Sequence, residues 1–375
     1  MGVPSEGHSV YRVRIVGAEV LLAKMLYCKN NVAIAAYSLT LPGHYSIEFL
    51  NLYERYSFVL RPQLAIHWFL GIWQAEFEFE PLDACSKGDC KTCETANVPG
   101  RWTSVPPAKI KDELTIEWAK DVQGLLRNMC LPLRKKEQDL QCGKDFFELA
   151  EADARDLENG RLQWHGYDCR IEPDWVWDRD ACLRDRYFCF MGDSHMRHNY
   201  DSFIMDFEGA SGLDESKVAD YLWIGWADDK PHDHCTDMLV NFGHWPLSYE
   251  SGDHPWDLSK YAENLERYTQ IMLKARERGA NVWWVTSNSA PTVWNHHGPF
   301  PEKRDWRTDP MLELFNTVAT GIMERAGITV IDTYDRTSVL NDVSYDAAHY
   351  RGYVGRALEV LILDTLCGVN RTKVL

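Results

Sequence analysis

The feature that most constrains the fold is an alternation of short apolar segments with longer amphipathic segments after Arg186. Strand-like segments cover 186–191, 221–225, 237–242, 281–286 and 328–332, and helix-like segments cover 195–207, 261–278, 310–326 and 347–366. Gly279 and Gly327 each end one of these helices. The alternation predicts a mostly parallel sheet with helices on both faces, in an α/β/α fold. Such sheets place their sites at the carboxyl ends of the strands.

The first part of the chain has a different pattern. Between residues 9 and 81, short alternating segments rich in β-branched and aromatic residues are separated by turns, as at 10–16, 32–37 and 46–53. This spacing predicts a small β-sandwich. We therefore expect a β-sandwich-like domain over 1–95, a connector over 96–159 and an α/β domain over 160–375.

The charge balance excludes several classes of partner. The chain has 40 Lys and Arg against 56 Asp and Glu, a net charge of −16. Nucleic acids and anionic membrane surfaces both require clustered basic residues, so neither is expected as a partner. The longest mostly apolar run, 18–36, is interrupted by charges and does not predict a membrane helix of roughly 20 residues. The N-terminus has no signal-peptide pattern, which leaves open a removed leader or anchor.

The chain contains 11 cysteines, many of them in polar, loop-like sequence. This distribution favours disulfides and an oxidising compartment. The participants we expect first are Cys85, Cys90 and Cys93, and the pair Cys169 and Cys182. The spacing of the first three also suits zinc, but no fourth ligand stands at zinc-finger spacing, and no metal is predicted. The group 232–235, His-Asp-His-Cys, is interpreted as a solvated loop rather than a metal cluster.

The sequence Gly192-Asp-Ser-His195 lies where the first predicted strand of the alternating region gives way to a helix. A serine at this position projects from the carboxyl edge of the sheet, beside the amide donors of a helix N-terminus. Serine is a weak nucleophile that needs an imidazole base and a carboxylate to orient that base. Asp346 and His349, around the start of the last helix, supply both groups. The alternative is that Gly-Asp-Ser is only a turn and Asp346 only a helix cap.

These motifs resemble the PC-esterase branch of the SGNH (GDSL-type) hydrolases. That branch includes plant trichome birefringence-like polysaccharide O-acetyltransferases and animal sialate O-acetyltransferases. The resemblance covers about residues 160 to 367, and the N-terminal β segment is similar to the immunoglobulin- or filamin-like domain of neurexophilin/PC-esterase proteins. The matching blocks are Gly192-Asp-Ser-His-Met-Arg197 with Asn199, Asn241-Phe-Gly-His-Trp245, Asp346-Ala-Ala-His349, and the upstream pattern Gly160-x3-Trp164, Trp175-x-Trp177 and Cys182.

The resemblance implies that Ser194 is acylated, that His349 moves protons and that Asp346 orients His349. It also implies an oxyanion hole formed by Ser194 with donors among Gly225, Asn241 and Gly243. The chain departs from the wider superfamily here, since Gly243-His-Trp-Pro246 stands where Gly-x-Asn-Asp is usual. The expected substrate-binding residues are Arg197, His244 and Trp245. Arg197 equally suits a salt bridge that secures the helix to the sheet.

The expected function is therefore carbohydrate O-acyl transfer, with an acetyl donor such as acetyl-CoA as co-substrate and no permanently bound cofactor. The expected location is the secretory pathway, in the Golgi lumen or outside the cell, and the sequon Asn370-Arg-Thr372 suits a glycoprotein. Two alternatives stay open: a carbohydrate acetylesterase with the same triad chemistry, and a non-catalytic ectodomain that binds a glycan or a protein.

Overall fold

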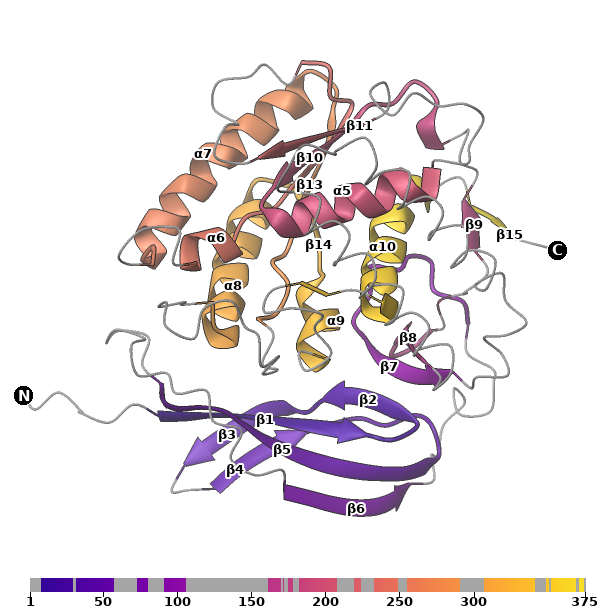
Figure 1. Cartoon of the computed structure of the whole chain (residues 1–375), viewed down its shortest axis with the longest axis vertical. Coiled ribbons are helices and arrows are strands. Elements are labelled where there is room, and N and C mark those ends of the chain that lie inside the picture. Colours follow the sequence, from indigo (N-terminus) through magenta and orange to yellow (C-terminus); the bar gives the residue numbers. More distant parts are fainter. Residues whose placement is uncertain are drawn as a thin grey trace, which may run out of the picture.

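A computed structural model of the chain describes most of the predicted α/β region and much of the N-terminal β region. The described residues are 8–29, 32–56, 73–79, 91–105, 161–169, 171, 175–177, 182–207, 219–223, 233–248, 255–290, 307–340, 349–350, 352–368 and 371–373. Figure 1 shows the two regions, with the N-terminal sheet below the helices of the α/β region.

Five strands form the parallel sheet that the alternating sequence predicts. They are β10 (Phe188–Gly192), β11 (Ala219–Trp223), β12 (Asp237–Val240), β13 (Asn281–Val285) and β14 (Thr329–Ile331). Their spatial order is β11-β10-β12-β13-β14, and every neighbouring pair is parallel. Numbered along the chain this order is 2-1-3-4-5, in which the direction of winding reverses between the first and third strands. The carboxyl ends of β10 and β12 are therefore the expected binding position.

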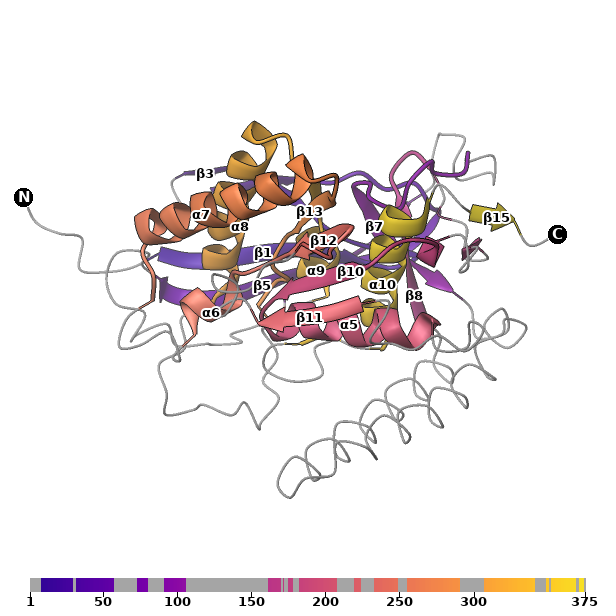
Figure 2. The ribbon, with the colours of Figure 1, turned by 90° about the horizontal axis from the view of Figure 1, so that it is seen from above.

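Helices cover both faces of this sheet because its strands carry apolar side chains on both sides. The helices are α5 (Ser194–Phe207), α6 (His244–Leu247), α7 (Leu258–Glu277), α8 (Asp309–Arg325), α9 (Tyr334–Val339) and α10 (Gly352–Cys367). Phe188 and Phe190 of β10 share a buried core with α5 and α10, whereas Cys189 and Met191 share another with α7 and α8. Figure 2 shows these two layers from above. The predicted α/β/α arrangement is present.

The N-terminal strands form one antiparallel sheet of six strands. Its order is β6-β5-β1-β2-β7-β8. Its strands are β1 (His8–Val16), β2 (Glu19–Leu22), β5 (Gly43–Tyr56), β6 (Trp73–Phe79), β7 (Gly100–Val105) and β8 (Arg161–Gly166). Two separate pairs are formed by β3 (Lys24–Lys29) with β4 (Val32–Ala36) and by β9 (Trp175–Trp177) with β15 (Arg371–Lys373). Segments from all three predicted parts of the chain thus contribute to this one sheet.

The predicted β-sandwich is not confirmed. Alternation along a strand shows that one face is buried, but it does not show what covers that face. Here Val20 of β2, Trp102 of β7 and Trp164 of β8 pack into the same core as β10. The indole Nε1 of Trp102 also donates to the carbonyl oxygen of Arg336, at 3.0 Å. In this molecule the α/β region covers part of the N-terminal sheet.

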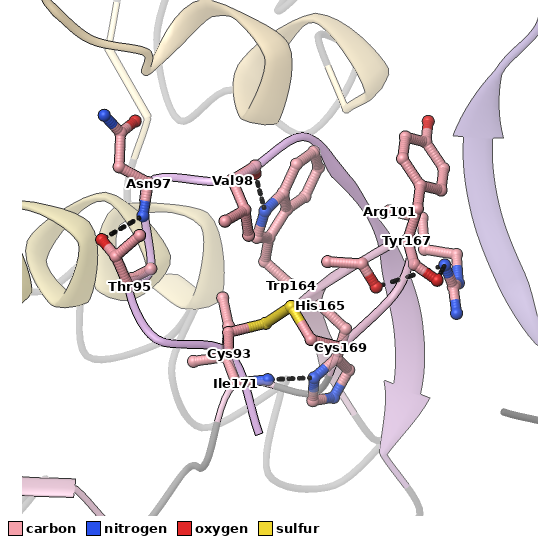
Figure 3. The surroundings of a disulfide bond; sticks show 12 residues. Cys93, Thr95, Asn97, Val98, Arg101, Trp164, His165, Tyr167, Cys169 and Ile171 are labelled. Atoms are coloured by element: carbon pink, nitrogen blue, oxygen red, sulfur yellow. Dashed lines mark hydrogen bonds between the residues drawn. A yellow bond between two sulfur atoms is a disulfide. The ribbon is translucent and has the colours of Figure 1, made fainter. Parts of the chain in front are cut away.

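Within the described residues, three disulfides join segments that are distant in the sequence. They are Cys93–Cys169, Cys182–Cys367 and Cys189–Cys235. The prediction of several disulfides is confirmed, although Cys169 and Cys182 bond to other cysteines and not to each other. Cys85 and Cys90 lie outside the described residues. Figure 3 shows the first bond beside Trp164, whose Nε1 donates to the carbonyl oxygen of Val98 at 3.4 Å.

The described helices include none that is long and apolar enough to cross a membrane. The mostly apolar run 18–36 forms strands β2, β3 and β4 in the described residues.

Candidate active site

Ser194 lies in a tight turn between β10 and α5. Gly192 is the last residue of β10, and Ser194 is the first of α5. A Cβ atom at Gly192 would lie 2.6 Å from the backbone oxygen of Asn241 and 2.6 Å from the Cβ of Met196. Only glycine therefore allows the turn to approach the end of β12 so closely. Ser194 is thereby placed at the switch point of the sheet and at the positive end of the α5 dipole.

Asp193 caps the start of α5 from within the protein. Its side chain is fully buried, its Oδ1 accepts from the backbone N–H of His195 at 3.0 Å, and its carbonyl oxygen accepts from the N–H of Arg197 at 3.1 Å. Burial raises the pKa of the Asp193 carboxyl, while the backbone N–H groups of His195 and His244 act in the opposite direction. Asp193 thus stabilises the turn that presents Ser194.

Tyr221 of β11 holds the same turn from the other side. Its hydroxyl oxygen lies 3.0 Å from the carbonyl oxygen of Gly192 and 3.1 Å from that of Asp193. Burial raises the pKa of Tyr221, so the hydroxyl keeps its proton and acts as a donor. Two carbonyl groups of the turn are therefore held by one phenol.

The structure brings together Ser194 and His349. The Nε2 atom of His349 lies 2.8 Å from the Oγ atom of Ser194, although the two residues are 155 positions apart in the sequence. This is the contact that the sequence analysis expected. The distance is within the range required for proton transfer between a nucleophile and its base. Asp346 lies outside the described residues.

The segment that carries His349 is tied to the loop after β13. The hydroxyl of Tyr350 donates to the carbonyl oxygen of Ser289 at 3.1 Å. The backbone N–H of Ser289 in turn donates to the Oγ1 of Thr337 in α9, at 2.9 Å. Both Tyr350 and Ser289 are buried, so these bonds are shielded from water.

The expected oxyanion donors differ in their surroundings. The side-chain amide of Asn241 is buried and donates to the carbonyl oxygen of Val285 at 2.8 Å and to the Oγ of Ser287 at 3.3 Å. Both of its N–H groups are thus used at the end of β13. Gly243 is packed so closely that a Cβ there would lie 2.0 Å from the Oγ of Ser287. Gly225 lies outside the described residues.

The three expected substrate-binding residues occupy different environments. The Arg197 side chain is exposed, and its guanidinium has no hydrogen-bond or ion-pair partner within the described ranges. His244 is only 1% exposed, and its Nε2 lies 2.9 Å from the carbonyl oxygen of Asn288. Trp245 is partly buried in α6. Of the three, Arg197 is the one whose charged group faces solvent.

Sequence reasoning missed several residues near Ser194. Asn288 contacts both His195 and His244. The charge of Arg307 partly opposes the rise that burial causes in the pKa of Asp193, and it adds to the lowering that burial causes in the pKa of His195. The signal for Asn288 was the polar run Thr286-Ser-Asn-Ser289 directly after a buried strand. Polar residues at that edge of a parallel sheet are placed to serve its site.

The side chains of Cys189, His234 and Cys235 form a separate group. Their potential ligand atoms all lie within 4.8 Å of one another, but the two sulfurs are joined in a disulfide. Bonded sulfurs are not thiolates, and thiolate is the form that binds metals. His232 lies outside the described residues.

Comparisons with known proteins gave matches in structure only. No protein-family model and no curated protein matches the sequence. A GDSL-like lipase from Bacteroides thetaiotaomicron has 11% identity and a TM-score of 0.38, with 50% of this chain and 90% of that chain covered. A lipase/acylhydrolase from Enterococcus faecalis has 14% identity and a TM-score of 0.36, with 51% of this chain and 98% of that chain covered. An acetylxylan esterase from Geobacillus stearothermophilus has 13% identity and a TM-score of 0.34, with 48% of this chain and 94% of that chain covered. These likenesses do not identify the reaction, which has to be inferred from the site.

Proposed function

We propose that this protein transfers an acyl group through an acyl-Ser194 intermediate. The observation that carries the proposal is the 2.8 Å separation between Ser194 Oγ and His349 Nε2 at the switch point of the parallel sheet. A serine held against an imidazole at a helix N-terminus has both a base and a nearby amide donor.

In the first half-reaction, His349 accepts the proton of Ser194 on Nε2 while Ser194 Oγ bonds to the carbonyl carbon of the acyl donor. Negative charge then develops on the carbonyl oxygen, and the backbone N–H of Ser194 is the proposed donor to it. As the tetrahedral intermediate collapses, the bond to the leaving group breaks. His349 gives its proton to that group, and an ester of Ser194 is left.

In the second half-reaction, an acceptor hydroxyl loses its proton to His349 and attacks the acyl carbon. The bond to Ser194 Oγ breaks, and the proton returns from His349 to Ser194. A sugar hydroxyl as acceptor makes the enzyme a transferase, and water makes it an esterase. Asp346 is proposed to orient His349, as the Asp-x-x-His motif implies.

The proposed substrate is a carbohydrate, and the proposed acyl group is acetyl, supplied by a donor such as acetyl-CoA. The support is the set of sequence blocks similar to PC-esterases. A place in the secretory pathway is proposed because three disulfides join the described residues, and disulfides persist in oxidising compartments.

Intact-mass measurement after incubation with p-nitrophenyl acetate tests the proposed intermediate. We expect one acetyl adduct, located on Ser194 by peptide mapping, and none on Ser194→Ala. His44→Ala is the control, because its side chain is 88% exposed on the N-terminal sheet. Labelling that persists unchanged in Ser194→Ala would place the reactive group elsewhere.

A second measurement separates transfer from hydrolysis. The protein is incubated with labelled acetyl-CoA and a panel of glycans, and the label is followed into glycan and into free acetate. Label in a glycan supports a transferase, and label in acetate alone supports an esterase. A non-catalytic binding protein would give neither product.

A further inference from the structure

The imidazole rings of His244, His195 and His349 lie in a row, and the ring of His198 contacts the His349 end of that row. The ring centroids of His244 and His195 are 3.9 Å apart with the planes inclined by 28°, and those of His195 and His349 are 4.8 Å apart at 40°. His198 meets His349 edge-on at 4.5 Å. The four rings come from α5, α6 and the segment before α10. The base of the proposed reaction is therefore in contact with two other histidines.

Asn288 anchors two of the four rings, those of His195 and His244. Its side-chain Nδ2 lies 3.0 Å from the Nδ1 of His195, and its backbone oxygen lies 2.9 Å from the Nε2 of His244. With the Asn288 amide as donor, Nδ1 of His195 is the acceptor and the neutral ring carries its proton on Nε2. His195 and His244 are 5% and 1% exposed, so packing also restricts both rings.

We propose that His195 is a positioning residue for His349, whose ring it holds beside Ser194 through a stack that Asn288 anchors. The proposal rests on the function proposed above. The ring of His349 makes its proton-transfer contact along one edge, at Nε2, so rotation or tilt of the ring would break that contact. A neighbouring ring that is itself fixed by a hydrogen bond and by stacking opposes such a tilt.

The electrostatics of the stack suit this role. Burial lowers the pKa of His195 well below its usual value. Positive charge on the neighbouring rings of His244, His349 and His198 lowers it further. Arg307 acts in the same direction, and Asp193 is the buried acid on the same turn. His195 is therefore neutral when His349 takes the proton from Ser194. A neutral aromatic ring attracts the resulting imidazolium, whereas a second cation would repel it.

Four variants test the proposal by the rate of Ser194 acylation and by KM for the ester. His195→Ala removes the ring, and we expect the rate to fall about 10²-fold with little change in KM. His195→Phe keeps a flat ring between His244 and His349 and should recover most of that loss. Asn288→Ala removes only the side-chain bond to His195, since the backbone oxygen that contacts His244 is kept, and it should give an intermediate loss. His44→Ala, on the distant sheet, should match the wild type.

Nuclear magnetic resonance of selectively labelled histidine gives a readout that does not depend on turnover. The ring protons of His349, assigned with His349→Gln, should show a ring-current shift that falls to the part contributed by His198 in His195→Ala and is largely kept in His195→Phe. An unchanged shift in His195→Ala would overturn the proposed stack. Equal rates for His195→Ala and wild type would overturn the positioning role. Absence of acylation in the wild type, with the ring-current shift present, would count against the proposed function instead.

Discussion

Arg12 of β1 is ion-paired with Asp309, the first residue of α8, across the junction between the N-terminal sheet and the α/β region. The Asp309 carboxylate also accepts from the hydroxyls of Ser289, at 2.5 Å, and Tyr334, at 3.1 Å. Ser289 follows Asn288, which anchors the histidine stack. The N-terminal sheet is thus linked by direct contacts to the loop behind the candidate site.

Removing Arg12 should destabilise the whole protein. Asp309 is 1% exposed, and Arg12→Ala would leave its charge buried without its cation. Such a loss costs about 3–5 kcal/mol. The matched control is Arg278→Ala, which removes an exposed ion pair with Asp233 and should cost less than about 1 kcal/mol. Urea denaturation of both variants measures the difference, and equal stabilities would contradict the importance of the buried pair.

Substitutions in the proposed catalytic group should not have additive effects. Ser194→Ala removes the nucleophile and His349→Ala the base, so each should abolish most turnover, and the double variant should lose little more. Asp346→Asn should lower turnover by about 10⁴-fold, as in serine proteases, if Asp346 orients His349. Steady-state kinetics with circular dichroism as a folding control measures these effects. Full activity of a folded Ser194→Ala protein would rule out the covalent mechanism.

The hydroxyl of Tyr221 should matter for both stability and reaction rate. Tyr221→Phe removes the donor to the carbonyl oxygens of Gly192 and Asp193 and should cost about 1 kcal/mol. We also expect slower acylation, because the turn that holds Ser194 becomes less restricted. Tyr11→Phe is the control, since Tyr11 is 53% exposed. Identical rates and melting temperatures for the two variants would exclude this role for Tyr221.

Two glycine substitutions should have opposite effects on stability. Gly192→Ala places a methyl group 2.6 Å from the Asn241 backbone oxygen, which should cost about 1–3 kcal/mol. Gly321 lies inside α8, and the nearest atom to an added Cβ is the flexible end of Arg325, at 3.4 Å. Gly321→Ala should therefore stabilise the protein by about 0.5–1 kcal/mol. Thermal unfolding of both variants checks the predicted signs.

The Cys189–Cys235 disulfide should stabilise the sheet beneath the site. It joins β10 to the segment before β12 across 46 residues of sequence. The chain-entropy model gives about 4 kcal/mol for a loop of this length, and replacing both cysteines with serine should lose a large part of it. Alkylation without reductant followed by peptide mapping tests the bond itself. Free thiols at both positions would contradict it and would weaken the proposed secretory location.

Local patterns predicted the α/β region well. A buried strand ending at Gly192, the helix after it, the other strands of the parallel sheet and the helices α7, α8 and α10 were expected within about five residues of where they lie, whereas the short helices α6 and α9 were not expected. These elements follow from apolar periodicity and from stop signals such as Gly279 and Gly327, both of which have positive φ. The N-terminal region was predicted less well, because β7 and β8 are short strands whose partners are far away in the chain.

The sequence by itself determined the local geometry of the site: a serine between a buried strand and a helix, with a histidine near the start of the last helix. Strand and helix patterns act over a few residues, so they can be recognised without knowing what packs against them. Only the tertiary structure decided which distant groups meet, including the partner of each cysteine, the ion pair of Arg12 with Asp309, and the contact of Asn288 with His195. Such contacts depend on long-range packing in three dimensions, and residue order alone does not specify them.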